Sequence, residues 1–335
     1  MQALQASPRP SPLGYGPKCP PFSGNFTVNR YQLYPENADF DFNNCLLYIG
    51  VVWNASVGIY DPYTKDIEIL EFDGITHDPI YHIGGVAANP RTSLVSIVVD
   101  YWPTILTGGV DMSGTNYIML LDPETRKLLY NFNITTVTQG RASGYQDVEF
   151  DPDDNVYVVG TYPSSIVKVD SKGKNLGIWY LDDKINSTVA GFTGLAANGW
   201  TLLASHSSEG NLYRLDMRSK RGKPELISVA PPHKIDTPDA IQLPPRYKGT
   251  VLLVAELFKG VSVFRDKTGK WKNAEYRGLV EWTDPGSVVT APVQVGDAVY
   301  MNLVPFGAGP GGGAGNATEF LYYDITAQVD ALLQG

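Results

Sequence analysis

The 335-residue chain has two cysteines, four histidines and no long apolar run, and these shortages exclude several classes of protein. No stretch approaches the about 18 consecutive apolar residues of a membrane span, because Asp, Pro or Gly interrupts each strand-like run. Lys and Arg total 26 against 35 Asp and Glu, and the net charge of −9 argues against a nucleic-acid partner, since phosphate neutralisation needs clustered cations. The one basic run, residues 218–223, is interpreted as a solvated hairpin tip.

The sequence also lacks the common hydrolase and metal signatures. It contains no serine nucleophile elbow, no zinc-protease helix and no Cys-x-x-Cys pair. Residues 307–312, GAGPGG, match a dinucleotide-binding glycine pattern in form, but a sequon and a strand-like segment follow instead of a helix, so a loop is expected. The acidic DPDDN segment at 151–155 lacks the ligand spacing of a calcium loop. No metal and no cofactor is predicted.

The cysteines and the glycosylation sequons favour the secretory pathway. Cys19 and Cys45 could form one disulfide that ties an N-terminal arm to the first repeat, or could remain two separate buried thiols. The N-terminal sequence has neither the basic nor the apolar region of a signal peptide, and we expect such a peptide to have been removed. Five sequons, more than chance would give, predict N-glycans at Asn25, Asn54, Asn133, Asn186 and Asn316.

The composition, with 43% hydrophobic and 18% charged residues, is that of a folded globular chain, and an internal repeat organises it. Four short strands separated by turns recur six times, most clearly at 145–180, where DPDDN is a hairpin turn. A four-stranded sheet buries both faces only when neighbours stack on it, so the repeat predicts an all-β, six-bladed β-propeller. The predicted blades span residues 36–75, 83–135, 145–183, 192–230, 238–282 and 288–326.

The last repeat has only three strands, and a spare strand at 26–34 is expected to supply its fourth and close the ring. A bridge between Cys19 and Cys45 would lock that closure. The chain is thus divided into an N-terminal arm, 1–25, and one propeller, 26–335, expected to be a monomer. A seven-bladed ring is the alternative.

Functional residues are expected on one face of the propeller. The inner strands all run the same way, so the loops that enter the first strands and those that join second to third strands meet there. These loops hold all four histidines and many aromatic residues, which suits a small, largely hydrophobic ligand. The residues predicted to act in catalysis are His82, Tyr145, Gln146, Asp147, His206 and Glu256. Those predicted to bind substrate are Trp53, Tyr81, Tyr101, Trp102, Tyr162, Thr237, Asp239, Phe258, Asn302 and Phe306.

Each prediction has a structural alternative. Asp147 and Asp239 could bond local backbone amides as turn residues. His82 and His206 could be structural, and the aromatic side chains could pack between blades. Glu256 follows an apolar run, so it is expected to be partly desolvated, with a raised pKa or with a cationic or metal partner.

Six segments in the first half of the chain resemble a fungal propeller family that includes the trichothecene-cluster virulence-associated protein. They are YPENADFD at 34–41, YIGVVWNASVGIYDP at 48–62, DPIYHIGGVA at 78–87, SIVVD at 96–100, GYQDVEFDP at 144–152 and NVYVVGTYPSSIVKVD at 155–170. From Gly191 onward only the blade pattern matches. Members of this family occur in secondary-metabolite clusters, and some are implicated as hetero-Diels–Alderases of tropolone-sesquiterpenoid biosynthesis.

The resemblance implies a pericyclase that joins an ortho-quinone methide tropolone to a humulene-type sesquiterpene alkene in an axial pocket. Such a reaction needs two reactants held in one orientation and hydrogen-bond donors aimed at the tropolone oxygens. An acid–base pair could also generate the quinone methide by dehydration. Two alternatives are a non-catalytic ligand-binding or virulence protein and a metal-dependent, lactonase-like hydrolase. The ligands of that metal would be Asp147, Asp239, Glu256 and Asn302.

Overall fold

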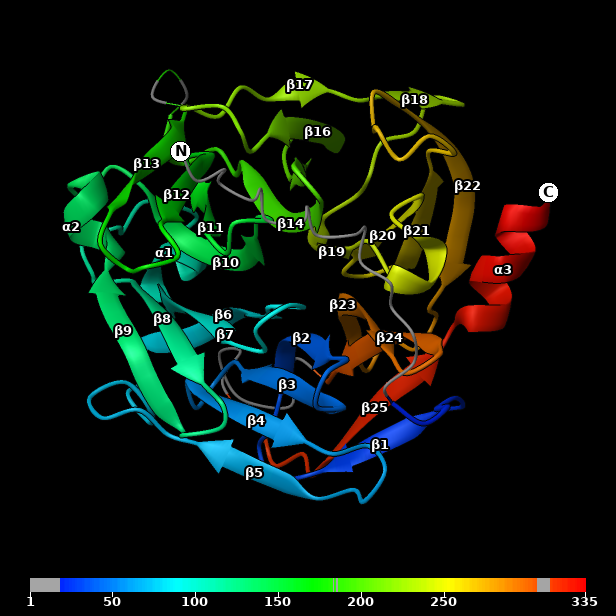
Figure 1. Ribbon diagram of the computed structural model, residues 1–335, viewed down its shortest axis with the longest axis horizontal. Coiled ribbons are helices and arrows are strands. Elements are labelled where there is room, and N and C mark those ends of the chain that lie inside the picture. The colour runs from blue at the N-terminus through cyan, green and yellow to red at the C-terminus, as the bar shows by residue number, and fades with distance from the viewer. Residues whose placement is uncertain (1–18, 183, 185, 306–313) are drawn as a thin grey trace, which may run out of the picture.

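The computed structural model describes residues 19–182, 184, 186–305 and 314–335, which form six small sheets in a ring (Figure 1). This arrangement confirms the predicted all-β, six-bladed propeller. Residues 1–18 of the predicted arm, Phe306 and the glycine segment 307–312 lie outside the described residues. The innermost strands contact one another in succession around the ring and enclose the axis.

The first three blades have four strands each. The first contains β2 (Pro35–Asp41), β3 (Leu46–Val51), β4 (Ser56–Tyr60) and β5 (Ile67–Leu70). The second contains β6 (Tyr81–Ala88), β7 (Val95–Tyr101), β8 (Tyr117–Asp122) and β9 (Lys127–Asn133). The third contains β10 (Ser143–Phe150), β11 (Val156–Tyr162), β12 (Ser165–Val169) and β13 (Leu176–Leu181).

The other three blades include one departure from the repeat. The fourth contains β14 (Phe192–Asn198), β15 (Thr201–His206), β16 (Asn211–Asp216) and β17 (Glu225–Leu226). The fifth contains β19 (Pro238–Gln242), β20 (Val251–Glu256), β21 (Gly260–Arg265), β22 (Asn273–Glu281) and β18 (Ser228–Ala230). The sequence repeat assigns residues 228–230 to the fourth blade, but β18 pairs with β22 in parallel. The sixth contains β23 (Val288–Val295), β24 (Ala298–Val304), β25 (Glu319–Asp324) and β1 (Phe26–Asn29).

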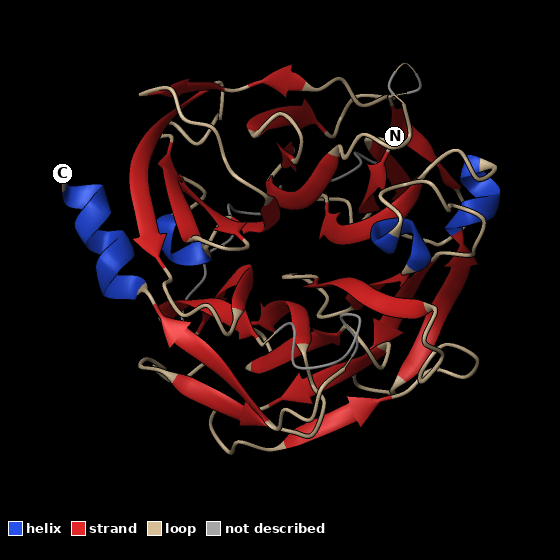
Figure 2. Ribbon diagram, turned by 180° about the vertical axis from the view of Figure 1, so that it is seen from behind, coloured by secondary structure: helices blue, strands red, loops and turns tan. Residues whose placement is uncertain are grey.

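Short helices complete the described chain. They are α1 (Pro103–Leu106), α2 (Ile134–Thr138), the 3-10 helix η1 (Pro245–Tyr247) and α3 (Thr326–Gln334). The α3 helix lies at the outer edge of the ring (Figure 2). Among the helices of the described residues, none combines the length and the apolar character that crossing a membrane requires.

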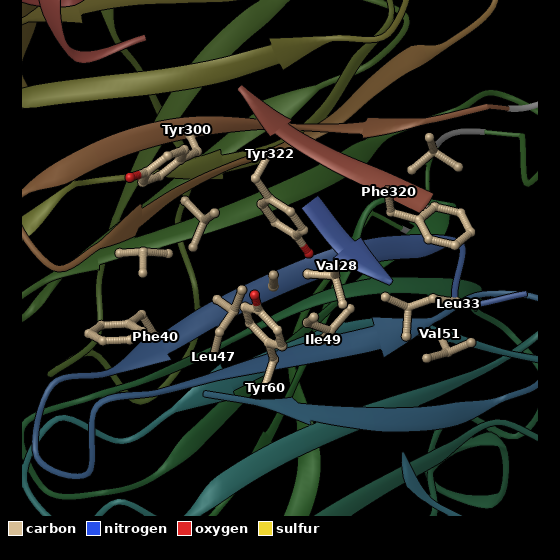
Figure 3. Close-up of a cluster of buried hydrophobic side chains, with 14 of the residues drawn as sticks. Val28, Leu33, Phe40, Leu47, Ile49, Val51, Tyr60, Tyr300, Phe320 and Tyr322 are labelled. Carbon is tan, nitrogen blue, oxygen red and sulfur yellow. The ribbon is translucent and has the colours of Figure 1, made fainter. Parts of the chain in front are cut away.

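The N-terminal strand closes the ring, as the repeat predicts. β1 pairs antiparallel with β25, and Phe26 lies opposite Tyr322, with the two rings stacked at 4.7 Å. Val28 inserts between the first and sixth blades and contributes to one apolar cluster with Phe320 and Tyr322 (Figure 3). Because β1 covers β25, the sixth sheet has no open outer edge at that strand.

A disulfide joins Cys19 to Cys45, as one of the two predicted alternatives requires. Cys45 lies in the turn between β2 and β3, so the bridge links the segment before β1 to the first blade. The loop that it closes contains β1, and the covalent link therefore retains the closing strand. Disulfides form and persist in oxidising compartments.

The predicted glycosylation sites differ in exposure. Three of the asparagines are exposed: Asn25, Asn186 and Asn316. The other two are half-buried: the side-chain amide of Asn54 lies 3.4 Å from the carbonyl of Gln32, and the side-chain Oδ1 of Asn133 accepts from the N–H of Thr136 at the start of α2. The side chains of the three exposed asparagines also accept hydrogen bonds, so burial is what distinguishes the second pair, which we call the half-buried sequons.

Acidic side chains join neighbouring blades around the axis. Asp39 of the first blade accepts from the N–H of Ala88 in the second, and Asp147 of the third accepts from the N–H of Leu195 in the fourth, both at 2.8 Å. Two more such bonds run from Tyr145 to Asp100 and from Ala197 to Glu149. These bonds satisfy backbone donors that would otherwise be buried without partners where the blades meet.

Candidate functional site

A pocket of about 220 Å³ lies at the axis on the face where the inner strands begin, here called the start face. Five of the six blades supply its walls, so no single blade forms it. Among its lining residues are Glu36, Val52, His82, Asp100, Trp102, Gln146, Thr161, Tyr162, Thr193, Thr237, Asp239 and Leu257. The structure thus brings together six of the predicted residues: His82, Trp102, Gln146, Tyr162, Thr237 and Asp239.

A β-bulge near the start of each inner strand explains how these side chains reach the axis. The register shifts in all six first-to-second strand pairs, at the second to fourth residue of each inner strand. Glu36, Gln146, Thr193 and Asp239 occupy the shifted positions in four different blades and line the pocket. A bulge inserts an extra residue and re-aims its side chain, which turns these four out of the strand alternation.

In the second blade the shifted position of the bulge is a glycine, Gly84, which also lines the pocket. A Cβ at Gly84 would lie 2.4 Å from the carbonyl oxygen of Tyr145, and one at Gly85 would lie 2.8 Å from that of Gln146. The two glycines therefore allow β6 to approach β10 closely. This approach holds His82 and Gln146 beside the same pocket.

Aromatic rings form one wall of the pocket. The His82 ring stacks on Trp102 at 4.0 Å. Trp53, a predicted binding residue, lies outside the pocket lining and packs nearly perpendicular to both rings, at 4.7 and 5.4 Å. His82 is only 3% exposed, and its Nδ1 has no hydrogen-bond partner. Burial lowers the pKa of His82 to about 3, so the imidazole is neutral.

Three carboxyl groups lie on the polar side. Burial and the nearby Asp100 raise the pKa of Glu36 to about 7, and burial raises that of Asp100 to about 7 against the opposing effect of backbone hydrogen bonds. Burial, and then the charge of Glu36, raises the pKa of Asp239 well above its usual value. The Oε2 atom of Glu36 is buried without a partner. At mildly acidic pH these groups carry protons and can donate hydrogen bonds to a ligand.

Tyr145 and Asp147, which the sequence predicts to act in catalysis, do not line the axial pocket. Tyr145 is fully buried in the apolar cluster between the second and third blades. Asp147 accepts from the backbone N–H groups of Val148 and Leu195 and from the Asn37 amide. This is the amide-binding role that the structural alternative foresees. Asp147 lines a separate pocket of about 120 Å³ farther along the axis, and burial raises its pKa to about 8.

His206 and Glu256 contact residues of their own blades and lie outside the residues that line the axial pocket. His206 meets the ring of Phe192 edge-on at 5.4 Å, and burial lowers the pKa of His206. The buried Glu256 carboxylate accepts from the N–H of Asp236 at 2.9 Å and from the Ser262 hydroxyl. The Nε2 of a third residue, His233, is 3.6 Å from it.

The remaining predicted binding residues also have other neighbours. Tyr81 packs on Tyr117 at 5.8 Å, and the Tyr101 hydroxyl donates to Asp111 at 3.1 Å. The amide of Asn302 donates to the carbonyl of Pro35 and to the Thr290 hydroxyl, and Phe258 is 73% exposed.

The four oxygen ligands of the lactonase alternative do not converge on one pocket, because only Asp239 lines the axial one. Within the ranges that the structure describes, no three His, Cys, Asp or Glu side chains form a group that could hold a metal ion.

Sequence reasoning missed Glu36 and did not select Asp100 for the site. Glu36 follows the first residue of β2, as Asp239 follows the first residue of β19, so aligning the repeats at the strand starts would have paired the two acids. Asp100 lies directly opposite His82 in the β6–β7 pair. The equivalent positions of two repeats therefore carried the signal for Glu36, and the pairing of adjacent strands carried the signal for Asp100.

Comparison with known proteins places this site in context. Trichothecene biosynthesis protein 14 of Trichoderma arundinaceum is 32% identical over 340 residues, which cover 96% of this chain and 93% of that protein. Core trichothecene cluster protein 14 of Fusarium sporotrichioides is 29% identical over 335 residues, which cover 94% and 88%. No family model matches the chain.

Two solved structures share the fold at low sequence identity. The Malassezia sympodialis allergen Mala s 1 superposes with a TM-score of 0.77 at 17% identity, covering 90% of this chain and 96% of that one. A gluconolactonase of Xanthomonas campestris superposes with a TM-score of 0.54 at 13% identity, covering 94% and 99%. At such identities the likeness concerns the propeller alone.

Proposed function

Because the chain belongs to the family of the trichothecene cluster protein 14 of fungi, a family of secondary-metabolite clusters, we propose that its axial pocket catalyses ring formation on an oxygenated, largely apolar metabolite. The specific reaction proposed is the hetero-Diels–Alder cycloaddition between an ortho-quinone methide tropolone and a humulene-type alkene. The gluconolactonase likeness supports the fold alone and adds no second candidate.

The observation that carries the proposal is the uncharged but hydrogen-bonding character of the pocket. The low pKa of His82 and the raised pKa values of Glu36, Asp100 and Asp239 keep all four groups neutral at mildly acidic pH. An apolar reactant enters such a pocket without desolvating fixed charges. The same groups can still pair with its oxygen atoms.

In the proposed reaction the carboxyl O–H groups donate to the carbonyl oxygen of the quinone methide. This polarises the diene and stabilises the negative charge that grows on oxygen as the two new bonds form. Gln146 can donate to a second tropolone oxygen, and the neutral imidazole of His82 can accept from a tropolone hydroxyl. The Trp102 face supports the flat ring, so the reactant is held in one orientation.

The test is to mix purified protein with a quinone methide precursor and a humulene-type alkene and to measure product rate and stereochemical ratio. We expect the rate to exceed the uncatalysed rate and one stereoisomer to dominate. Asp239→Leu removes a preorganised donor and should lower the rate about 100-fold. His82→Gln removes the imidazole and should also lower the rate. His77→Gln, a matched control at an exposed histidine on the same face, should retain the wild-type rate.

An uncatalysed rate and stereochemical ratio in the presence of wild-type protein would remove the pericyclase proposal. Wild-type rates in both pocket variants would show instead that the reaction takes place elsewhere in the molecule. Circular dichroism of each variant checks that the propeller is folded.

A further inference from the structure

Exposed apolar side chains gather beside the axial pocket. Leu106 and Val110 are 60% and 73% exposed, and Val189 and Phe258 are 38% and 73% exposed. We call these four residues the apolar crown. They come from loops of the second, fourth and fifth blades, although large apolar side chains on a soluble surface usually occur singly.

Three of the four members of the crown adjoin a residue of the pocket wall in the sequence. Leu106 follows Ile105, Val189 precedes Ala190 and Phe258 follows Leu257, and all three of these neighbours line the pocket.

Val110 follows Gly109, which packs tightly against the pocket wall. A Cβ at Gly109 would lie 2.6 Å from the ring of Tyr162, a lining residue, and 2.3 Å from the carbonyl oxygen of Ser187. The loop after α1 thus meets the loop before β14. The crown residues therefore lie on chain segments that either line the pocket or pack against its wall.

The axial pocket is small for two reactants. Its volume of about 220 Å³ is below the about 300–1,000 Å³ of pockets that enclose a drug-sized ligand. A cycloaddition joins two molecules, and a pocket of this size holds the reacting part of one of them. The carboxyl groups and His82 favour the oxygenated reactant, since a hydrocarbon would leave them unpaired.

We propose that the apolar crown is a second subsite, which holds the hydrocarbon reactant over the mouth of the oxygen-binding pocket. This inference rests on the proposed function. A hydrocarbon has no group to pair with the pocket, but it removes water from the exposed side chains of the crown when it binds there. The alkene then lies against the diene, which extends from the pocket.

The experiment measures the two binding events separately and without turnover. Tropolone is the probe for the pocket, followed by quenching of tryptophan fluorescence. α-Humulene is the probe for the crown, followed by its displacement of Nile red. The variants are Leu106→Ser and Phe258→Ser in the crown, with Leu129→Ser on β9 as the matched control, since Leu129 is 54% exposed and lies away from the pocket lining.

We expect each crown variant to weaken α-humulene binding about tenfold, which corresponds to the loss of one partly buried apolar side chain. Tropolone binding should be unchanged in the crown variants, and His82→Gln should show the reverse pattern. Leu129→Ser should bind both probes as the wild type does. Equal α-humulene binding by wild type and crown variants would overturn the inference.

A second outcome would also overturn it. If the wild type but not the crown variants sediments with phosphatidylcholine vesicles, and α-humulene fails to displace Nile red, the crown contacts lipid and not a reactant. Failure of the proposed function looks different, because the two probes would then still bind separately while no cycloaddition occurs.

Discussion

Replacing Glu36 with Gln should stabilise the protein at alkaline pH and leave its stability unchanged in acid. Burial, together with Asp100, raises the pKa of Glu36 from 4.5 to about 7 in the folded state. The folded state therefore binds this proton more tightly than the unfolded state does. The resulting loss of stability is absent below pH about 4.5, grows as the pH rises to about 7 and then stays constant.

The magnitude follows from the two pKa values. The difference between 4.5 and about 7, at about 1.36 kcal/mol per pH unit, corresponds to about 3 kcal/mol of unfolding free energy. Glu36→Gln keeps the shape of the side chain and removes the charge. It breaks no hydrogen bond at Oε2, because that atom has no partner. The free energy of unfolding of the variant should thus exceed that of the wild type by about 3 kcal/mol at pH 8.

The assay is urea unfolding at pH 4 and pH 8, followed by tryptophan fluorescence. Glu124→Gln, at an exposed glutamate in a turn, is the matched control and should follow the wild type at both pH values. A Glu36→Gln variant that differs from the wild type equally at pH 4 and pH 8 would refute the reasoning. The side chain would then act through packing and not through its proton.

Three further predictions concern activity, closure and modification. The cycloaddition rate should fall as the pH rises through about 7, because the pocket carboxyls lose their donor protons; a rate that is constant from pH 5 to 9 would contradict this. Replacing Cys19 and Cys45 with Ser should lower the unfolding free energy by about 3.5 kcal/mol, the entropy of a loop with sequence separation 26, measured against oxidised wild type. Mass spectrometry of protein secreted by a fungal host should find glycans at the exposed Asn25, Asn186 and Asn316 and not at the half-buried sequons.

The sequence predicts the fold well because a propeller is built from local units. Turn residues such as those of DPDDN and the β-branched strands beside them mark each hairpin, and every blade packs against its immediate neighbours. The same reasoning predicts which strand closes the ring. A last blade with three strands leaves an open edge, and β1 covers it. The sequence repeat assigns residues 228–230 to the wrong blade. These residues form β18, which pairs in parallel with β22, far along the chain, and no hairpin marks that contact.

The site was predicted only in part, for a physical reason visible at Gln146 and Asp147. These neighbours in β10 point to different parts of the axis, one into the pocket of the start face and the other into the pocket beyond it. The bulge between Tyr145 and Asp147 decides which side chain faces which pocket. Loop membership alone does not report this, so Tyr145 and Asp147 were grouped with Gln146 although their surroundings differ.

The sequence by itself determined the number of blades, the order of their strands and the face that gathers aromatic and histidine residues, because each depends on local patterning. Only the tertiary structure decided which side chains meet. Six bulges converge on one axis and bring Glu36 and Asp239, 203 positions apart in the sequence, close enough for the charge of one to raise the pKa of the other. That coupling arises when five blades exclude water from a shared volume, and no single repeat contains it.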